Sequence, residues 1–203
     1  MTDDQLDKLR SWYRNVRPLY ASLANVVQNT IESLLKQERV DYLNVTSRAK
    51  SEASFLEKVR RKTYKKPEEE ITDLAGIRVI TFIESDLTKV SNLIESSFNV
   101  IPTKSLNKTE ELGIDRFGYR SLHFVCDLGK DRIKLPEFLP YKDLLFEVQV
   151  RTVLQHAWAE IEHDRNYKFS GVLPTHLQRR LHLLAGVLEI VDREFATLAC
   201  VFR

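Results

Sequence analysis

The run Phe146–Thr152 (FEVQVRT) constrains the fold of this chain most strongly, because apolar and polar residues alternate along it. Successive side chains of a β-strand point to opposite faces of the sheet. Glu147, Gln149 and Arg151 would therefore share one face, and the apolar members of the run would share the other. An ordinary half-exposed strand gives the same alternation. The run predicts a strand with one face in a core, and leaves open whether its polar face carries out chemistry or is simply solvated.

The composition is that of a soluble globular protein. The chain has 203 residues, 43% hydrophobic and 30% charged, which is enough for one domain with a core and helical extensions. A formal net charge of +2 does not indicate a globally basic surface, so an anion site would need a local cluster of basic residues. The acidic N-terminus and the absence of a run of about 18 apolar residues predict a cytoplasmic protein with no membrane partner. Cys126 and Cys200 predict free, buried thiols in a reducing compartment.

Helical periodicity dominates both ends of the chain, and strand-like runs lie between them. We expect a helical region over residues 4–38, with a second segment starting at Pro18, and another over 47–66, with Ser51 as its N-cap. The other expected elements are strands at 77–82, 100–102, 121–127 and 144–151, and helices at 85–98, 153–167 and 175–202.

Three segments follow from this pattern: an N-terminal helical arm (1–46), a central domain (47–168) and a C-terminal helical segment (169–203). The last helical pattern reaches the end of the sequence without a C-cap signal. The C-terminal segment is therefore expected to be either truncated or a helix that docks on a partner.

Basic residues are concentrated between Arg48 and Lys66, where the sequence has eight of them and only two acidic residues. On a helix, Lys50, Ser54 and Lys58 would recur every four residues and share one face. Such a row of donors suits a chain of phosphates. The alternative is a solvated basic face that binds nothing.

Two acidic residues occur beside apolar strand-like runs, where an unpaired carboxylate would be costly. Asp73 precedes the run at 77–82, and Glu147 lies within the run at 144–151. Mg²⁺ in phosphate-transfer sites is held by one or two carboxylates together with substrate phosphates. Asp73 and Glu147 are therefore the candidate ligands of a Mg²⁺ cofactor beside the basic row.

Four motifs resemble, in order and spacing, those of the RelA/SpoT synthetase domain. They are Arg48–Ser51 with Ser54 and Lys58, Asp73–Arg78, Gly118–His123, and Glu147–Thr152 followed by His156–Glu160. The resemblance covers about residues 47–168 and implies an α+β fold, with a mixed sheet of about five strands flanked by helices, related to nucleotidyltransferases. No hydrolase domain accompanies it, so the chain is most similar to small alarmone synthetases or their toxic relatives.

The resemblance implies an ATP-dependent transfer of pyrophosphate to a ribose 3′-hydroxyl. Arg48 and Arg78 resemble the two guanidinium groups that sandwich adenine, a role suited to planar cations. Lys50, Ser54 and Lys58 would then bind the ATP phosphates.

The same resemblance assigns the catalytic and acceptor positions. Asp73 resembles the magnesium ligand, and Glu147 resembles the residue that activates the acceptor hydroxyl and shares the metal. Tyr119 resembles the aromatic residue that stacks on the acceptor base. The remaining acceptor-side candidates are His123, Gln149 and Lys168, although a plain core histidine fits His123 equally well on sequence grounds.

The segment before Tyr119 leaves the acceptor open. Guanosine-nucleotide synthetases commonly carry a lysine and a small or proline-containing turn there, whereas this chain has Asp115–Gly118, with Arg116 in a position to replace the lysine. A GDP or GTP acceptor is the first expectation, followed by an adenosine nucleotide. In a toxin the acceptor would be the 3′ end of tRNA, held by the basic set Arg60, Arg61, Lys62, Lys65 and Lys66. The alternative that is not an enzyme is a catalytically idle module that binds a nucleotide or RNA.

Two further interpretations concern the helices. His156, Glu160 and His163 have the spacing of three metal ligands on one helical face, although no partner segment supports this. The terminal helices are candidates for homo-oligomer formation, and a toxic synthetase would have an antitoxin partner.

Overall fold

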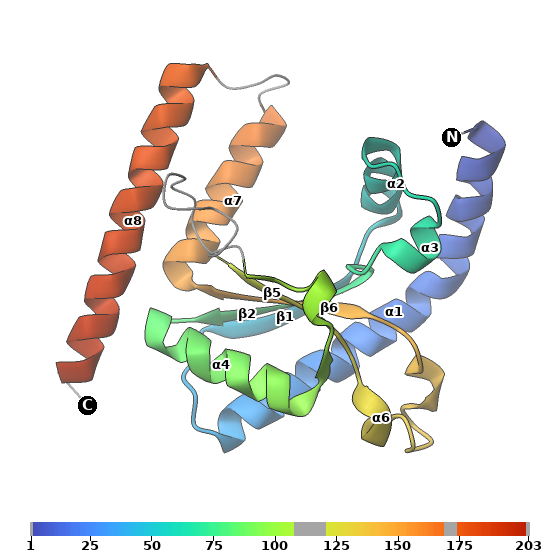
Figure 1. Cartoon of the computed structure of the whole chain (residues 1–203), viewed down its shortest axis with the longest axis horizontal. Helices are drawn as coiled ribbons and strands as arrows, with labels where there is room; N and C mark the ends of the chain where they lie inside the picture. Colours follow the sequence, from blue (N-terminus) through green and yellow to red (C-terminus); the bar gives the residue numbers. More distant parts are fainter. Residues whose placement is uncertain (1, 108–120, 169–173, 202–203) are drawn as a thin grey trace.

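A mixed β-sheet forms the centre of the molecule, with helices on both sides (Figure 1). The computed structural model describes the backbone of residues 2–107, 121–168 and 174–201, and the side chains there except at 106–107, 163–168 and 200. The strands are β1 (Asn44–Ala49), β2 (Ala75–Thr81), β3 (Asn99–Val100), β4 (Leu106–Asn107), β5 (Leu122–Asp127) and β6 (Phe146–Thr152). The helices are α1 (Asp3–Gln37), α2 (Glu52–Arg61), α3 (Pro67–Glu70), α4 (Glu84–Ser97), α6 (Gly129–Arg132), α7 (Val153–Lys168) and α8 (Thr175–Val201), with 3₁₀ turns η1 (Pro102–Lys104) and η2 (Leu139–Tyr141).

The sheet confirms the expected mixed architecture of about five strands. Its order is β1-β2-β6-β5-β3, and the short strand β4 pairs with β5. β2 and β6 are parallel, whereas the β1–β2 and β5–β6 pairs are antiparallel. β6 therefore lies between β2 and β5 and aligns its polar residues with theirs.

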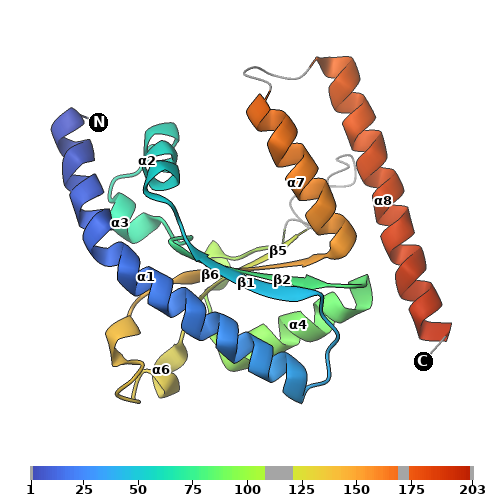
Figure 2. The ribbon, with the colours of Figure 1, turned by 180° about the vertical axis from the view of Figure 1, so that it is seen from behind.

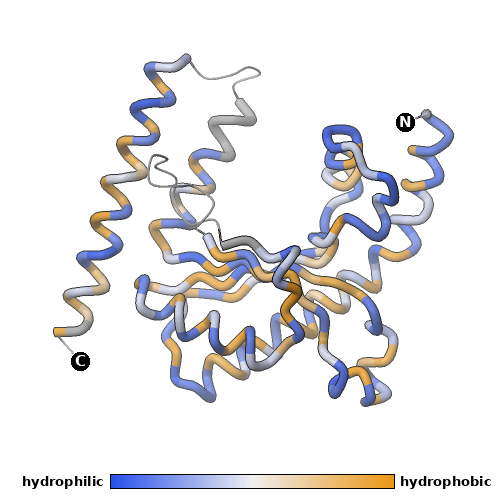
Figure 3. The backbone as a smooth tube through the Cα atoms, viewed as in Figure 1, coloured by the Kyte–Doolittle hydropathy of each residue, from blue (hydrophilic) through white to orange (hydrophobic). Residues whose placement is uncertain are grey.

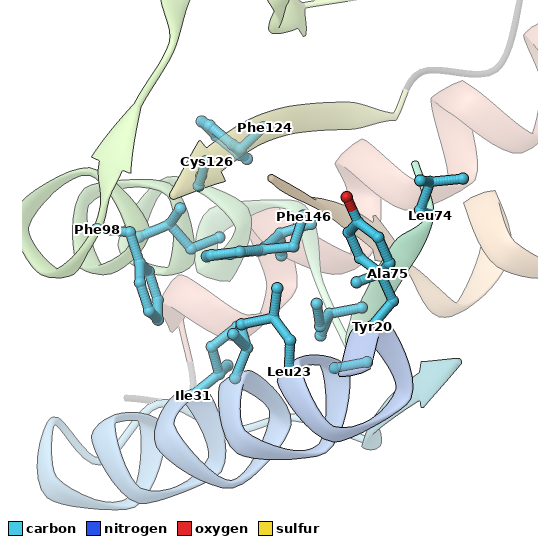
Figure 4. Packing of buried hydrophobic residues seen from close by; sticks show 14 of the residues in the cluster. Tyr20, Leu23, Ile31, Leu74, Ala75, Phe98, Phe124, Cys126 and Phe146 are labelled. Atoms are coloured by element: carbon cyan, nitrogen blue, oxygen red, sulfur yellow. The ribbon is translucent and has the colours of Figure 1, made fainter. Parts of the chain in front are cut away.

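One face of the sheet is covered by α1 and α4 (Figures 1 and 2). Phe146 of β6 is fully buried, and Leu23 and Ile31 of α1 pack around it from the helix side (Figure 4). The predicted alternation of β6 is confirmed, because its apolar residues are buried, whereas its charged and amide side chains are half-buried. The opposite face is thus left to Glu147 and Gln149, between α2 and α7.

The N-terminal helix is continuous, so the expected second segment starting at Pro18 is wrong. Pro18 lies inside α1, which begins at a Thr2 capping box and ends at Gln37. Tyr13 and Leu23, on either side of the proline, are both fully buried in the same core. Tertiary packing of one apolar face therefore outweighs the local cost of an internal proline.

The expectation of a helical region starting at residue 47 is also wrong. Residues 44–49 form β1, which pairs along its whole length with β2. Cross-strand pairing decides the structure here, because strand preference depends on neighbours more than on local composition. The Ser51 N-cap is confirmed, since Ser51 Oγ accepts a hydrogen bond from the Ser54 backbone at 3.2 Å. The expected boundary between residues 46 and 47 falls within β1, and the domain division itself stays a prediction.

The expected burial of Cys126 is confirmed, whereas the side chain of Cys200 is not among those that the structure describes. Cys126 is a free, fully buried cysteine, and burial, with a smaller contribution from Asp127, raises its pKa to about 12. Among the described residues, none of the helices is both long and apolar enough to cross a membrane.

Candidate active site

A cavity of about 260 Å³ opens on the polar face of the sheet. It is lined by Thr46, Ser47, Arg48, Lys50, Asp73, Gly76, Ile77, Arg78, Glu147 and Gln149. Six predicted site residues are therefore brought together from β1, β2, β6 and the segments that follow β1 and precede β2. Both candidate carboxylates, Asp73 and Glu147, are among them.

Asp73 is held by two lysines, and we call these three residues the lysine end of the site. Its carboxylate lies 2.7 Å from Lys50 Nζ and 2.9 Å from Lys58 Nζ. Burial raises the pKa of Asp73, but hydrogen bonds and charge from Lys50 and Lys58 outweigh burial and hold the pKa below its ordinary value. The lysine end therefore carries an ionised carboxylate between two cations.

Lys50 does not lie on a helix, which corrects the expected four-residue row with Ser54 and Lys58. It lies between β1 and α2, where its backbone N–H donates to Leu74 O at 2.9 Å. From α1, Tyr13 Oη donates to Lys50 O at 2.6 Å and Arg17 Nε donates to it at 3.2 Å. The N-terminal helix thus fixes the backbone of a site lysine, a role that the sequence did not reveal.

Glu147 is held by different chemistry, and we call Ser121, His123, Glu147 and Gln149 the histidine end of the site. His123 Nδ1 lies 2.7 Å from Glu147 Oε1, and Gln149 Nε2 donates to the same oxygen at 2.8 Å. Burial raises the pKa of Glu147, and the charge of Asp73 raises it slightly more. The hydrogen bond and charge of His123, together with the hydrogen bond of Gln149, outweigh these effects, so the pKa of Glu147 lies below its ordinary value. Both described hydrogen bonds converge on Oε1, which leaves Oε2 as the oxygen for another partner.

Ser121 completes the histidine end and was not predicted. Its Oγ lies 2.8 Å from His123 Nε2, and Ser121 is buried with 7% of its surface exposed. An ionised carboxylate only accepts hydrogen bonds, so His123 donates from Nδ1, and the network assigns Ser121 as the donor to Nε2 when the ring is neutral. His123 is therefore a hydrogen-bonded part of the site rather than a plain core histidine.

Arg48 and Arg78 extend from neighbouring strands into the lining of the cavity. Arg48 on β1 is exposed, whereas Arg78 on β2 lies beside Gln149 in the register of the sheet. Arg78 Nη1 also lies 3.0 Å from Glu160 of α7, whose side chain is 57% exposed. Two guanidinium groups are thus available at the edge of the cavity nearest β1 and β2.

Several predicted residues are not placed in the cavity. Ser54 is exposed and takes part in the N-cap of α2, and it is not among the lining residues. Tyr119 and Arg116 lie outside the described residues, and so does the side chain of Lys168. The alternative metal site on α7 is not supported: no group of three His, Cys, Asp or Glu side chains in the described part of the chain could hold a metal, and the side chain of His163 is not described.

Comparison with known proteins decides the family. A family model described as a region found in RelA/SpoT proteins matches residues 47–172. This chain belongs to the RelA/SpoT family. Its matched region contains both carboxylates and both lysines of the site.

Individual members of the RelA/SpoT family agree with the match. The GTP pyrophosphokinase YjbM of Bacillus subtilis is 32% identical over 155 residues, covering 75% of this chain and 69% of the relative. The small alarmone synthetase 1 of Bacillus subtilis superposes with a TM-score of 0.76 and 26% identity, covering 95% of this chain and 97% of that one. The same synthetase bound to its product pppGpp gives a TM-score of 0.76 and 27% identity, with 94% and 97% covered. The fold of this chain is that of the small alarmone synthetases.

Proposed function

We propose that this protein is an ATP-dependent pyrophosphokinase that transfers the β,γ-pyrophosphate of ATP to the ribose 3′-hydroxyl of GDP or GTP, making a (p)ppGpp-type alarmone. The observation that carries this proposal is the placement of two ionised carboxylates, Asp73 and Glu147, on one cavity beside two lysines. Relatives named GTP pyrophosphokinase and a small alarmone synthetase solved with pppGpp support the guanosine acceptor.

The lysine end would bind the donor. Lys50 and Lys58 would contact the triphosphate, and Arg48 and Arg78 would lie against the adenine, since guanidinium groups stack on planar rings. Lys50 and Lys58 are paired with Asp73 in the free protein. An incoming triphosphate offers these lysines more negative charge than one carboxylate does, so we expect them to turn from Asp73 toward the phosphates.

The residues at the cavity fit a magnesium ion. Both carboxylates have lowered pKa values and are therefore ionised at neutral pH. Mg²⁺ keeps several waters and is usually bound by one or two carboxylates together with substrate phosphates, so two acids on one cavity are sufficient. Asp73, with Glu147 sharing it, would hold the ion, which neutralises charge on the transferring phosphates.

The histidine end would activate the acceptor. As the acceptor 3′-oxygen bonds to the β-phosphorus, its proton moves to Glu147 and AMP leaves with the electron pair of the broken P–O bond. His123 and Gln149 saturate Oε1 of Glu147, so Oε2 is the oxygen that would take the proton. Tyr119 and Arg116 would contact the acceptor base and phosphates, together with Lys168.

The test is transfer of label from ATP labelled on its terminal phosphate, in the presence of magnesium, to GDP, GTP, ATP or bulk tRNA offered separately. We expect label on GDP or GTP. Glu147→Gln should lower transfer by about 10²–10⁴-fold, since it removes the base without removing volume, while ATP binding persists. Glu137→Gln, at an exposed position in the segment before β6, is the matched control. Transfer at the wild-type rate in Glu147→Gln would contradict the assignment of the base.

A tRNA acceptor is the second candidate, because most of the basic residues in the last turn of α2 and just after it are exposed and form no ion pair with another described residue. Arg60, Arg61, Lys62 and Lys65 form no ion pair with another described residue, whereas Lys66 pairs with Glu69 at 3.0 Å. Arg60, Lys62 and Lys65 also line a second cavity, of about 440 Å³, between α2, α3 and the start of α1. Label on tRNA alone would favour this acceptor and a toxin with an antitoxin partner. Label on no acceptor would favour the idle binding module.

A further inference from the structure

The peptide carbonyl of Lys50 is held by side chains of α1. Lys50 lies between the end of the β1–β2 ladder and the first backbone hydrogen bond of α2. Its carbonyl oxygen accepts from Tyr13 Oη at 2.6 Å and from Arg17 Nε at 3.2 Å, and both donors belong to α1. The orientation of this peptide therefore depends on the N-terminal helix.

The rest of Lys50 is tied to the segment that carries the proposed magnesium ligand. Lys50 N–H donates to Leu74 O at 2.9 Å, and Leu74 directly follows Asp73 in the sequence. Lys50 Nζ in turn lies 2.7 Å from the carboxylate of Asp73. Lys50 is thus fixed in the free protein at its N–H, at its carbonyl and at its ammonium group, and α1 supplies the partners of the carbonyl.

Tyr13 is a rigid donor, because its ring is fully buried and stacks on the ring of Phe55 in α2. The two ring centroids are 4.4 Å apart, and the angle between the rings is 18°. Burial, against an opposing effect of the Arg17 charge, raises the pKa of Tyr13 to about 12, so the hydroxyl keeps its proton at neutral pH. Figure 1 shows the N-terminal part of α1 beside α2, and Figure 3 shows hydrophobic and hydrophilic residues along it.

The hydroxyl of Tyr13 is not needed for this packing. Stacking on Phe55 belongs to the aromatic ring, and a phenylalanine would provide it equally well. A buried phenolic hydroxyl costs free energy unless it forms a hydrogen bond. Here that bond goes to the backbone of Lys50, which lines the cavity of the proposed active site. The hydroxyl is therefore the part of Tyr13 that connects α1 with the lysine end.

We propose that Tyr13 is a positioning residue of the donor site, whose hydroxyl orients the Lys50 peptide so that the Lys50 ammonium group can reach the triphosphate of ATP. This inference rests on the proposed function, which assigns Lys50 to the donor. When the triphosphate draws the ammonium group from Asp73, only the side-chain torsions of Lys50 need to change, because its peptide is already fixed. Preorganisation of this kind lowers the conformational cost of binding.

Tyr13→Phe tests the hydroxyl alone, because it keeps the buried ring. We expect the Kd for ATP, measured by titration calorimetry with magnesium and no acceptor, to rise by about three- to tenfold, the range of one intramolecular hydrogen bond. The KM for ATP should rise by the same factor while kcat stays within about twofold, since the bond acts equally in the ground state and the transition state. A purely structural role would lower the melting temperature and leave the Kd unchanged.

Tyr20→Phe is the matched control for the loss of a hydroxyl. Tyr20 is another buried tyrosine of α1, and it is not one of the donors to Lys50 O. We expect the Kd for ATP to stay at the wild-type value. An equal rise in both variants would show that the contact with Lys50 is not the cause.

A double-mutant cycle tests whether Tyr13 acts through Lys50. Lys50→Met removes the ammonium group, so adding Tyr13→Phe to it should change the Kd for ATP by less than about 1.5-fold. Added to Lys58→Met, Tyr13→Phe should still raise the Kd by about three- to tenfold, because Lys58 belongs to α2 and keeps no bond to Tyr13. The two lysines contact the same carboxylate, so the comparison separates the contact with Tyr13 from the contact with Asp73.

Arg17→Gln provides a second test that leaves the core untouched, because Arg17 is exposed. It removes the longer of the two bonds to Lys50 O, and we expect the Kd for ATP to rise by about two- to threefold. Arg14→Gln removes the same charge from the same part of α1, but Arg14 pairs with Glu52 at 2.7 Å and is 65% exposed. This control should have no effect on the Kd, since solvent screens the pair.

Two results would overturn this inference alone. One is a wild type that binds ATP together with a Tyr13→Phe variant that binds it equally well. The other is an effect of Tyr13→Phe that is just as large in the Lys50→Met background. A wild type that binds no ATP would instead contradict the donor assignment itself, and the inference with it. Failure of pyrophosphate transfer is a separate outcome, because transfer is read from label on the acceptor, whereas the Kd for ATP is measured without one.

Discussion

The two carboxylates of the site line one cavity but are held by opposite kinds of partner. At the lysine end, Asp73 contacts the cationic groups of Lys50 and Lys58. At the histidine end, Glu147 contacts the imidazole of His123 and the amide of Gln149. The negative charge of a triphosphate attracts the ammonium groups of lysines strongly. It attracts an amide or an imidazole much less, so Gln149 and His123 would stay on Glu147. If ATP binds at the lysine end as proposed, we therefore expect the lysine end to rearrange and the histidine end to keep its geometry.

Among the variants that distinguish the two ends of the site, Asp73→Asn has the largest expected effect on pyrophosphate transfer. It removes the negative charge of the proposed magnesium ligand and one of the two oxygens that accept from the lysines, so transfer should fall by about 10²–10³-fold, which corresponds to several kcal/mol of charge stabilisation. Magnesium should also cease to strengthen ATP binding, which titration calorimetry with and without the ion would measure. Asp131→Asn, at an exposed carboxylate on α6, is the control. Unchanged magnesium dependence in Asp73→Asn would place the ion elsewhere.

His123→Phe should affect turnover and leave ATP binding intact. It removes the donor to Glu147 Oε1 but keeps an aromatic ring in the half-buried position, and we expect kcat to fall by roughly 10–100-fold, as for other residues that orient a catalytic group. His123→Gln keeps a donor and should recover part of the loss. Steady-state kinetics with varied ATP would check this. A rise in the KM for ATP at unchanged kcat would show that the two ends are not separate.

The sequence predicted the strands that carry the site better than the contacts that position it. The alternation of apolar and polar residues in β6 correctly indicated one buried and one polar face. Side chains of a strand alternate between the two faces of the sheet, and one face of β6 is covered by helices. β1 was missed, because its pairing with β2 is a long-range property that composition does not encode. The break predicted at Pro18 was wrong for the same reason. Buried residues of α1 on both sides of the proline pack in one core and stabilise a continuous helix.

For the site, the sequence predicted which residues take part but not the contacts that hold them in place. The resemblance named both carboxylates and both lysines, but not the hydrogen bonds of Tyr13 and Arg17 to Lys50 O, which depend on how α1 crosses the sheet. Ser121 was likewise missed, because a serine beside a strand gives no signal until the neighbouring histidine is placed. The roles assigned to Tyr119, Arg116 and Lys168 stay predictions.

The lysine end should also contribute to stability in a pH-dependent way. The pKa of Asp73 is lowered in the folded protein by Lys50 and Lys58 despite burial. A lowered carboxyl pKa contributes stability above the unfolded pKa of about 3.9, and this stability is lost as pH falls through the folded pKa. Lys58→Met removes one cause of the shift and should cost about 1 kcal/mol at pH 7.

Urea unfolding at several pH values measures this effect. The difference between wild type and Lys58→Met should shrink as the pH falls below the pKa of Asp73 in the wild type, where the carboxyl is protonated in both proteins. Lys89→Met is a useful comparison, since Lys89 also pairs with an aspartate, Asp86, at 2.7 Å but lies on α4 away from the cavity. A difference for Lys58→Met that is constant with pH would mean that the lysine acts by packing rather than through the charge of Asp73.

The smallest expected effect comes from the ion pair at the edge of the cavity. Glu160 lies 3.0 Å from Arg78, but its side chain is 57% exposed, so solvent screens the pair. Glu160→Gln should change the free energy of unfolding by less than about 1 kcal/mol. If Arg78 contacts the adenine as proposed, this variant also frees it for that contact, and the KM for ATP should stay the same or fall by about two- to threefold. If the KM instead rises several-fold while stability is unchanged, Glu160 holds Arg78 in its binding position, and the edge of the donor site is prearranged by α7 rather than free to close on the nucleotide.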